Sequence, residues 1–167
     1  MGDQPGTVFL VGFMGAGKTT VGRILARLLG WDFVDLDDLI VQAEGRGIPA
    51  IFAGEGEAYF RRVERGMLAS LRGRTRLVVA CGGGTYANDE NRLLIDRMGR
   101  AVWLQVPLRQ ALARCASGGE ERPLLRTEAE ADALYRRRLA TYRSASLHVD
   151  ADGLTAEQVA ERIAGML

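Results

Sequence analysis

The sequence predicts an α/β fold, a three-layer sandwich in which helices cover both faces of a mainly five-stranded parallel sheet. Two observations support this prediction. Short apolar runs alternate with longer segments of helical periodicity. The apolar runs are continuous, as expected of strands that are buried on both faces. The length of 167 residues suits one domain, and the 47% of hydrophobic residues is ordinary for a globular protein.

The expected elements follow from the apolar pattern in chain order. Strands are expected at residues 7–11, 33–36, 77–81, 101–106 and 147–149. Helices are expected at residues 18–29, 37–44, 88–98, 108–115, 128–144 and 155–167, with one short and one longer helix in 48–71. Gly30 is expected to end the first helix and Thr155 to cap the last. Residues 117–127 carry two glycines and a proline, which favours a long loop of the kind that acts as a lid.

The most specific motif follows the first expected strand. Residues 12–19, GFMGAGKT, match the phosphate-loop pattern GxxxxGK[ST] at every fixed position, between a strand and a helix. Glycines let the backbone curl around phosphates, and the helix N-terminus adds partial positive charge. Lys18, the single lysine of the chain, is expected to reach the β- and γ-phosphates, and the Thr19 hydroxyl to bind Mg²⁺. The alternative is a glycine-rich turn without a ligand.

The composition argues against several classes of function. The 22 basic and 21 acidic residues leave a net charge of +1, whereas binding to duplex nucleic acid usually needs a large positive excess. Cys81 and Cys115 form no CxxC pair, which disfavours a disulfide framework or a zinc site and favours a reducing compartment. Neither a signal segment nor an apolar run of about 18 residues is present, so a cytoplasmic protein that binds no membrane is expected.

Two carboxylates lie near the end of the second expected strand. The sequence has no guanine-reading NKxD motif, and its third strand runs into glycines, so Asp35 and Asp37 are the candidate partners of the phosphate loop. At positions i and i+2 of a strand they would share one face, at the sheet edge where ligands bind. One would hold Mg²⁺ through water, and the other would orient or deprotonate an attacking hydroxyl. Alternatively, Asp37 or Asp38 caps the next helix.

A triple glycine and an arginine add further candidates. Glycines 82–84 follow the third strand and would allow a ligand to approach the backbone closely, or would only form a tight turn. Arg61 has Glu57 four residues before it and Glu64 three residues after it. These three residues form either a surface row of ion pairs or a site in which Arg61 grips the carboxylate of a ligand.

The second half of the chain contains further arginines. Arg122, in the expected lid, would swing onto a transferring phosphate or would remain a solvated loop residue. Arg136, Arg137 and Arg138 are consecutive on a helix and therefore point in different directions, so at most one or two of them face a site. The single histidine, His148, is expected to be structural.

These motifs, in their order and spacing, resemble the shikimate kinases, which are small P-loop kinases. The resemblance runs nearly end to end and rests on GxxGAGKTT from residue 12, FVDLD from residue 33, GEAYFRRVE from residue 56, GGG from residue 82, RPLL from residue 122 and RxxxY from residue 138. It implies a P-loop kinase fold in a single domain over residues 1–167. The lid would be mobile and lie around 117–127, and the substrate-binding region would lie around 37–64.

The resemblance also implies a reaction and the residues that perform it. ATP would phosphorylate the 3-hydroxyl of shikimate, giving shikimate 3-phosphate and ADP in aromatic amino-acid (chorismate) biosynthesis. The implied catalytic residues are Lys18, Asp37 and Arg122. Nucleotide would contact Gly15, Ala16, Gly17, Lys18, Thr19, Thr20, Arg114 and Arg122; shikimate would contact Asp37, Arg61, Gly83 and Arg138; Mg²⁺ would be placed by Thr19 and Asp35. The spacing to Tyr142 favours Arg138 over its neighbours. Residues 152–156 lack the arginine and proline that some relatives place near the adenine.

Two other functions remain open from the sequence. A related kinase of gluconate or of a nucleoside would use the same phosphate loop and lid. Two arginines suit a carboxylate rather than a nucleobase, which leaves gluconate as the closer rival. A non-catalytic nucleotide-binding module is disfavoured because it would not need Lys18, Thr19, Asp35 and Asp37 together. A small-molecule substrate and a monomer are therefore expected.

Overall fold

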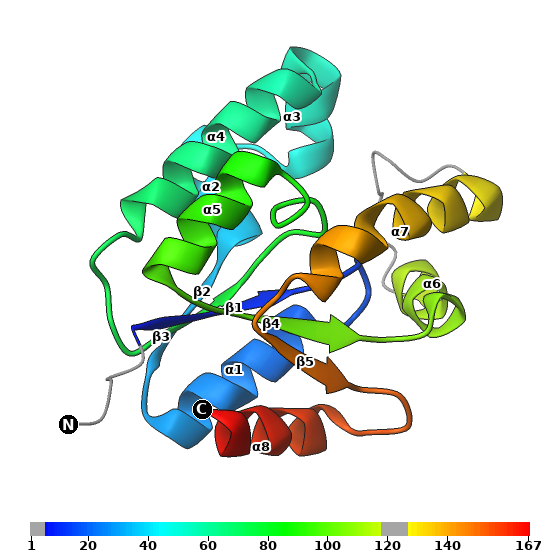
Figure 1. Cartoon of the computed structure of the whole chain (residues 1–167). Helices are drawn as coiled ribbons and strands as arrows, with labels where there is room; N and C mark the ends of the chain where they lie inside the picture. Colours follow the sequence, from blue (N-terminus) through cyan, green and yellow to red (C-terminus); the bar gives the residue numbers. More distant parts are fainter. Residues whose placement is uncertain (1–5, 118–126) are drawn as a thin grey trace.

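The computed structural model describes residues 6–117 and 127–167 and contains one five-stranded sheet between layers of helices (Figure 1). The strands are β1 (Thr7–Val11), β2 (Asp32–Asp35), β3 (Leu77–Ala80), β4 (Gly99–Gln105) and β5 (Leu147–Asp150). Every pairing is parallel, and the strand order is β2-β3-β1-β4-β5. The predicted α/β class and parallel sheet are confirmed, although β2 and β4 begin one and two residues earlier than expected.

Eight helices connect or follow these strands in the described part of the chain. They are α1 (Lys18–Leu29), α2 (Leu36–Glu44), α3 (Ile48–Glu55), α4 (Glu57–Ser70), α5 (Asp89–Met98), α6 (Leu108–Ser117), α7 (Glu128–Arg143) and α8 (Ala156–Met166). Helices α1 and α8 lie on one side of the sheet, and α4, α5 and α7 lie on the other (Figure 1). As predicted, Gly30 ends α1, in the left-handed conformation with φ 67°. Thr155 caps α8 in a capping box with Gln158.

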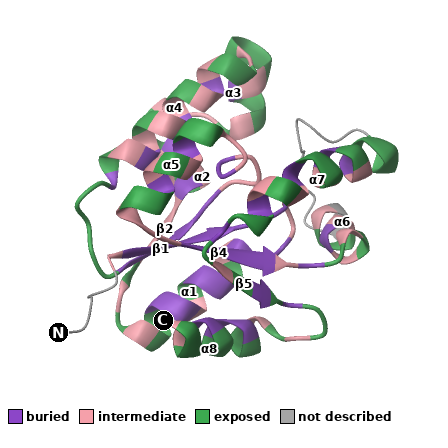
Figure 2. Ribbon diagram, in the orientation of Figure 1, coloured by how far each residue is buried: buried purple, intermediate pink, exposed green. Residues whose placement is uncertain are grey.

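The core lies on both faces of the central strands (Figure 2). All residues of β1 and β3 are buried, whereas the edge strands β2 and β5 are partly exposed. In the strand register Ala80 lies beside both Leu10 and Asp35, so the first three strands end at the same level. The segments that follow them, which are the phosphate loop, the two aspartates and the triple glycine, therefore begin on one rim of the sheet.

Two expectations from the sequence concern residues 117–127. The expected lid lies mostly outside the described residues, and so does Arg122. Ser117, which was expected to begin that loop, is instead the last residue of α6. No described helix is long and apolar enough to cross a membrane.

Candidate active site

The phosphate loop turns sharply between β1 and α1. Gly12, Gly15 and Gly17 have positive φ angles of 146°, 76° and 91°, which residues with a Cβ rarely adopt. Lys18 folds back over the loop, and its Nζ donates hydrogen bonds to the carbonyl oxygens of Gly12 at 2.6 Å and of Phe13 at 3.0 Å. Gly17 caps α1 without any side-chain hydrogen bond, so the first turn of this helix has no side-chain cap. The loop is thus shaped to receive phosphate oxygens.

Asp35 connects the phosphate loop to the next helix. Its Oδ2 accepts a 2.6 Å hydrogen bond from Thr19 Oγ1, and its Oδ1 accepts a 3.2 Å hydrogen bond from the Asp38 amide. Asp35 is therefore the N-cap of α2, and the alternative in which Asp37 or Asp38 caps this helix is wrong. The reason is that β2 ends at Asp35, whose φ and ψ of −98° and 120° are still extended.

The end of β2 also changes how the two aspartates come together. Leu36 already begins α2, so Asp35 and Asp37 do not share one face by strand alternation as predicted. Both nevertheless line the same cavity beside the phosphate loop, together with Lys18 and Thr19. The sharing of one rim is thus confirmed, but a strand end followed by a first helical turn produces it.

Arg114 of α6 contacts the phosphate loop. Its Nη1 donates hydrogen bonds to the carbonyl oxygens of Gly15 at 3.3 Å and of Ala16 at 3.2 Å. A cavity of about 230 Å³ lies beside these residues. Leu154, in the segment before α8, and Ala156, the first residue of α8, also line this cavity with apolar side chains. An apolar wall next to an arginine suits a flat aromatic base.

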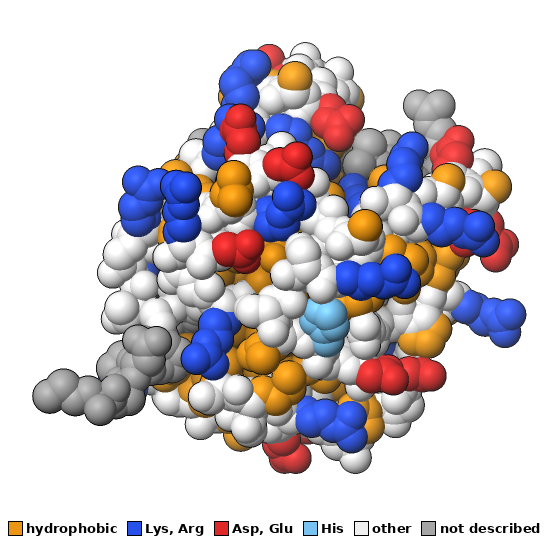
Figure 3. Space-filling view, in the orientation of Figure 1, with side chains coloured by type: hydrophobic (Ala, Val, Ile, Leu, Met, Phe, Trp, Pro, Cys, Tyr) orange, Lys and Arg blue, Asp and Glu red, His pale blue; other side chains and the backbone are white. Residues whose placement is uncertain are grey.

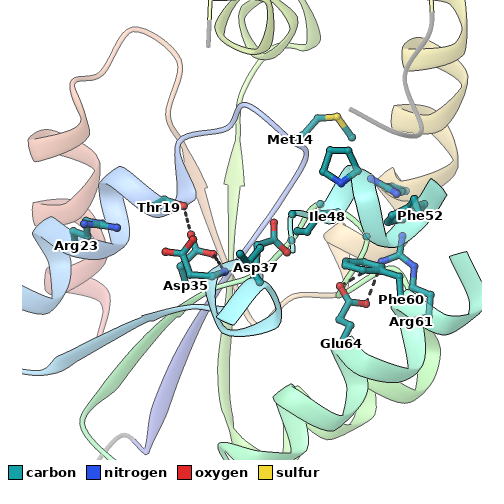
Figure 4. A pocket seen from close by; sticks show the side chains of 18 residues that line it. Met14, Thr19, Arg23, Asp35, Asp37, Ile48, Phe52, Phe60, Arg61 and Glu64 are labelled. Carbon is teal, nitrogen blue, oxygen red and sulfur yellow. Dashed lines mark hydrogen bonds and ion pairs between the residues drawn. The ribbon is translucent and has the colours of Figure 1, made fainter. Parts of the chain in front are cut away.

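A larger cleft of about 630 Å³ lies on the other side of the loop. Its lining includes Asp37, Arg61, Gly83 and Arg138, which are the predicted substrate-binding residues, and the predicted metal ligands Thr19 and Asp35. Figure 4 shows Asp37 between the Thr19–Asp35 pair and the Arg61–Glu64 pair. The volume of the cleft falls in the usual range for small-molecule sites.

The two arginines of the cleft meet at the triple glycine. A Cβ atom at Gly84 would lie 2.6 Å from Nη2 of Arg61 and 3.0 Å from Nη2 of Arg138. The Gly83 position is similarly close, at 3.2 Å from Nη1 of Arg138. A turn is present as well, because the Thr85 amide donates to the Gly82 carbonyl at 3.2 Å. The turn is therefore confirmed, and the glycines also make room for two guanidinium groups. Close approach of a ligand to their backbone stays a prediction.

Arg138 is the member of its triplet that faces the cleft. Arg136 and Arg137 are exposed, and Arg136 pairs with Asp132 on the outside of α7. Arg138 is buried, and its Nη1 has no hydrogen-bond partner among the described residues. Burial lowers the pKa of Arg138, and the charge of Arg61 lowers it further, against the opposing effect of Tyr142. An anionic ligand would satisfy the buried donor and offset both charges.

Glu64 is a buried anchor for Arg61, a role that was not expected from the sequence. Its carboxylate accepts hydrogen bonds from Arg61 at 3.1 and 3.3 Å, from Thr85 at 2.8 Å and from Asn91 at 3.3 Å. The Arg61–Glu64 pair is therefore not part of a surface row of ion pairs, because the Glu64 side chain is only 1% exposed. The sequence pattern that could have predicted the burial of Glu64 is its position four residues from both Phe60 and Leu68, on the buried stripe of α4.

An apolar wall of the cleft was also missed. Ile48 and Phe52 of α3 line the cleft with Phe60 of α4, and the Phe52 and Phe60 rings lie 4.8 Å apart. The available signal was the composition of α3, IPAIFAGE, which is largely apolar although only Ile51 is buried. Apolar side chains on a helix that does not enter the core are candidates for a ligand wall.

The fold and the site together define the class of protein. A strand, a phosphate loop and a helix in the middle of a parallel sheet are the hallmark of P-loop nucleotide-binding proteins. A separate cleft for a second small molecule, which shares two aspartates with the phosphate loop, is the arrangement of a small-molecule kinase.

Comparison with known proteins identifies the family. The family model described as shikimate kinase matches residues 14–167. The shikimate kinase of Persephonella marina is 40% identical over 96% of this chain and 98% of its own, and that of Moorella thermoacetica is 44% identical over 96% and 93%. The structure of Acinetobacter baumannii shikimate kinase in complex with shikimate is 38% identical, with a TM-score of 0.90 over 97% of this chain and 92% of that one. The chain belongs to the shikimate kinase family, which confirms the resemblance.

A more distant likeness extends the fold beyond this family. Deoxyadenosine kinase from M. mycoides, with bound dATP, has a TM-score of 0.65 over 96% of this chain and 98% of that one, at 15% identity. At that identity the likeness concerns the fold alone.

Proposed function

We propose that this protein transfers the γ-phosphate of ATP to the 3-hydroxyl of shikimate, giving shikimate 3-phosphate and ADP in aromatic amino-acid biosynthesis. The observation that supports this most is the meeting of Arg61 and Arg138 at Gly84, with an unpartnered buried donor, in the cleft that adjoins the phosphate loop. Two guanidinium groups suit a carboxylate, and the neighbouring aspartate suits a hydroxyl. Shikimate carries both groups.

The acceptor would be held at three points. Arg61 and Arg138 bind its carboxylate, and the backbone of Gly83 binds a ring hydroxyl. Asp37 accepts a hydrogen bond from the attacking hydroxyl and orients it toward the γ-phosphate, acting as a base if the proton leaves early. Ile48 and Phe52 cover the apolar side of the ring. Holding both reactants in this way supplies much of the rate enhancement.

The donor would be held by the phosphate loop. The backbone of residues 15–20 and the Lys18 ammonium bind the phosphates, and Arg114 borders the adenine cavity. Lys18 neutralises charge on the transferred group, where catalysis in this class of reaction is mainly electrostatic. Arg122 lies outside the described residues, and we propose that it comes from the lid around 117–127 onto the same phosphates.

The Thr19–Asp35 pair fits Mg²⁺. A hydroxyl and a carboxylate oxygen are ligands that this ion prefers, and it keeps several waters. The described residues contain no group of three or more carboxylate, histidine or cysteine side chains placed to hold a metal, so nucleotide phosphates would complete the coordination. When bound, Mg²⁺ neutralises the β- and γ-phosphate oxygens.

The surroundings of the reaction are part of the proposal. Both cysteines are free thiols, which supports a reducing cytoplasm. Acidic and basic side chains are interspersed on the face shown in Figure 3, which supports a small-molecule substrate rather than nucleic acid as the partner. We further propose that the protein acts as a monomer with a single domain over residues 1–167.

A coupled assay of ADP release tests the proposed function. The purified protein is given MgATP with shikimate, with gluconate, or with no acceptor. We expect turnover with shikimate only. Turnover with gluconate and not with shikimate would replace the proposal by a gluconate kinase. ATP binding without turnover on either acid would leave only a nucleotide-binding function.

A further inference from the structure

Tyr142 joins the two parts of the cleft that would hold the acceptor. It is fully buried and lies one helical turn after Arg138 on α7. Its hydroxyl donates a 2.6 Å hydrogen bond to the carbonyl oxygen of Gly83. The sequence singled out this tyrosine only as a spacing mark in the RxxxY motif, without a role.

The ring of Tyr142 is fixed from the other side by the sheet. Trp103 of β4 stacks on it, with ring centroids 5.8 Å apart and an interplanar angle of 30°. Trp103 is itself held edge-on by His148, at 5.3 Å. The tyrosine hydroxyl is therefore presented to Gly83 from a ring that has little freedom to move.

Helix α7 depends on such side-chain contacts for its position. In residues 6–117 and 127–167, no other helix or strand packs its backbone extensively against α7. The helix is attached through side chains instead. Tyr135 contacts Phe13 of the phosphate loop edge-on at 5.4 Å, and Tyr142 bonds to Gly83. The second contact joins the helix to the triple glycine by a hydrogen bond.

The hydrogen bond of Tyr142 sets the geometry on both sides of it. On the Gly83 side, it fixes the peptide that joins Gly83 to Gly84, where both guanidinium groups converge. On the helix side, Arg138 lies one turn before Tyr142; burial lowers the pKa of this guanidinium, and the neighbouring Tyr142 opposes that shift. Burial raises the pKa of Tyr142 to about 12, so the hydroxyl remains a donor throughout the neutral range.

We propose that Tyr142 is a positioning residue for the acceptor, which holds Arg138 and the Gly83 backbone at the separation that one shikimate molecule requires. This inference rests on the proposed function. Tyr142 does not touch the reacting atoms; it acts through its two neighbours. Loss of its hydroxyl should therefore weaken shikimate binding and leave nucleotide binding intact.

Steady-state kinetics of Tyr142→Phe test this role. We expect the KM for shikimate to rise about 3- to 10-fold, the range for one lost hydrogen bond, while the KM for ATP stays unchanged. Tyr86→Phe is the matched control: Tyr86 is also fully buried, and its hydroxyl donates a 3.1 Å bond to Asp96, away from the cleft. Replacement of Tyr142 by p-aminophenylalanine keeps a donor and should restore the KM.

The outcomes separate this inference from the proposed function. An unchanged shikimate KM in Tyr142→Phe, or an equal rise in Tyr86→Phe, would overturn the positioning role while wild-type turnover upholds the kinase. A KM for ATP that rises in parallel would also overturn it, because the effect would then be a general loosening. If Tyr142→Phe does not fold, the p-aminophenylalanine variant decides: a wild-type KM supports the role, and a raised KM contradicts it. No wild-type turnover of shikimate would overturn both proposals.

Discussion

Lys18 stabilises the fold of the phosphate loop by donating hydrogen bonds to carbonyl oxygens of that loop. Its ammonium bonds to Gly12 and Phe13 at 2.6 and 3.0 Å, so the charge is already in place when phosphates arrive. In Lys18→Ala both this support and the charge on the transferred group are lost. We expect kcat to fall by about 100-fold or more, the usual cost of one such electrostatic contact. The coupled ADP-release assay measures it, and a kcat within a few-fold of wild type would contradict the role of Lys18.

Arg61 differs from its neighbour Arg62 in what it faces. Arg61 lines the cleft, whereas Arg62 is exposed and lies over the Tyr59 ring at 5.7 Å. Arg61→Ala should raise the KM for shikimate about 10- to 150-fold, the range for a lost charged hydrogen bond, with little change for ATP. Arg62→Ala is the matched control and should change neither. A wild-type shikimate KM in Arg61→Ala would refute the carboxylate assignment.

The sequence predicted individual residues well where a local motif defines them. The phosphate loop is such a case, because its eight positions are contiguous and chemically constrained. For Glu64 the sequence left open a surface row of ion pairs or a ligand site at Arg61, because its partners Thr85 and Asn91 come from a distant turn and from α5. No local pattern relates these three residues; only the packing of α4 against α5 brings them together.

At the scale of elements, Glu64 joins α4, α5 and the turn after β3. In Glu64→Gln one acceptor becomes an amide donor that faces other donors. We expect the free energy of unfolding to fall by about 1–3 kcal/mol, and the shikimate KM to rise because Arg61 loses its anchor. Urea unfolding and kinetics measure both. Glu57→Gln is the control, because Glu57 is 55% exposed and should cost less than about 0.5 kcal/mol. Equal effects in the two variants would refute the anchoring role.

Helix and strand bounds were predictable where the residues that begin or end an element act locally. Gly30 and Thr155 end and begin helices through their own backbone and hydroxyl groups, and both were recognised. The start of α2 was placed one residue late because FVDL continues the apolar pattern of the strand. Asp35 ends that strand by capping the helix, and the competition between the two structures is decided by its bonds to Thr19 and Asp38.

At the scale of the whole molecule, buried ionisable groups make the free energy of unfolding vary with pH in the alkaline range. Tyr142 has a folded pKa of about 12 against 10.0 for an ordinary tyrosine, because of burial. Between these values the unfolded chain releases the proton and the folded protein keeps it. The free energy of unfolding therefore falls as pH rises, by up to about 1.4 kcal/mol per pH unit for this group. Below pH 10 the contribution is fully present.

Comparison of wild type with Tyr142→Phe isolates this dependence. Burial also raises the pKa of the Cys81 thiol, but that group is present in both proteins. Urea unfolding at pH 9, 10 and 11 should show wild type losing stability more steeply than the variant above pH 10. Parallel curves for the two proteins would mean that Tyr142 titrates in the folded state as it does in the unfolded chain.

The fold class followed from the sequence, but the strand order did not. Continuous apolar runs between helices indicate a parallel sheet whatever the order of its strands. The placement of β3 between β1 and β2 depends on pairings such as Thr7 with Leu77, which are seventy residues apart in the chain. That order brings the glycine loop between the phosphate loop and the aspartates, and so creates the cleft.

The position of the phosphate on the product tests the central claim most directly. After complete reaction of shikimate with MgATP, proton and phosphorus NMR identify which hydroxyl carries the new phosphate. The account predicts one product, phosphorylated at the 3-hydroxyl, in equal amount to the ADP released. Phosphate on another hydroxyl, or ADP without phosphorylated shikimate, would contradict the placement of the acceptor between Asp37 and the two arginines.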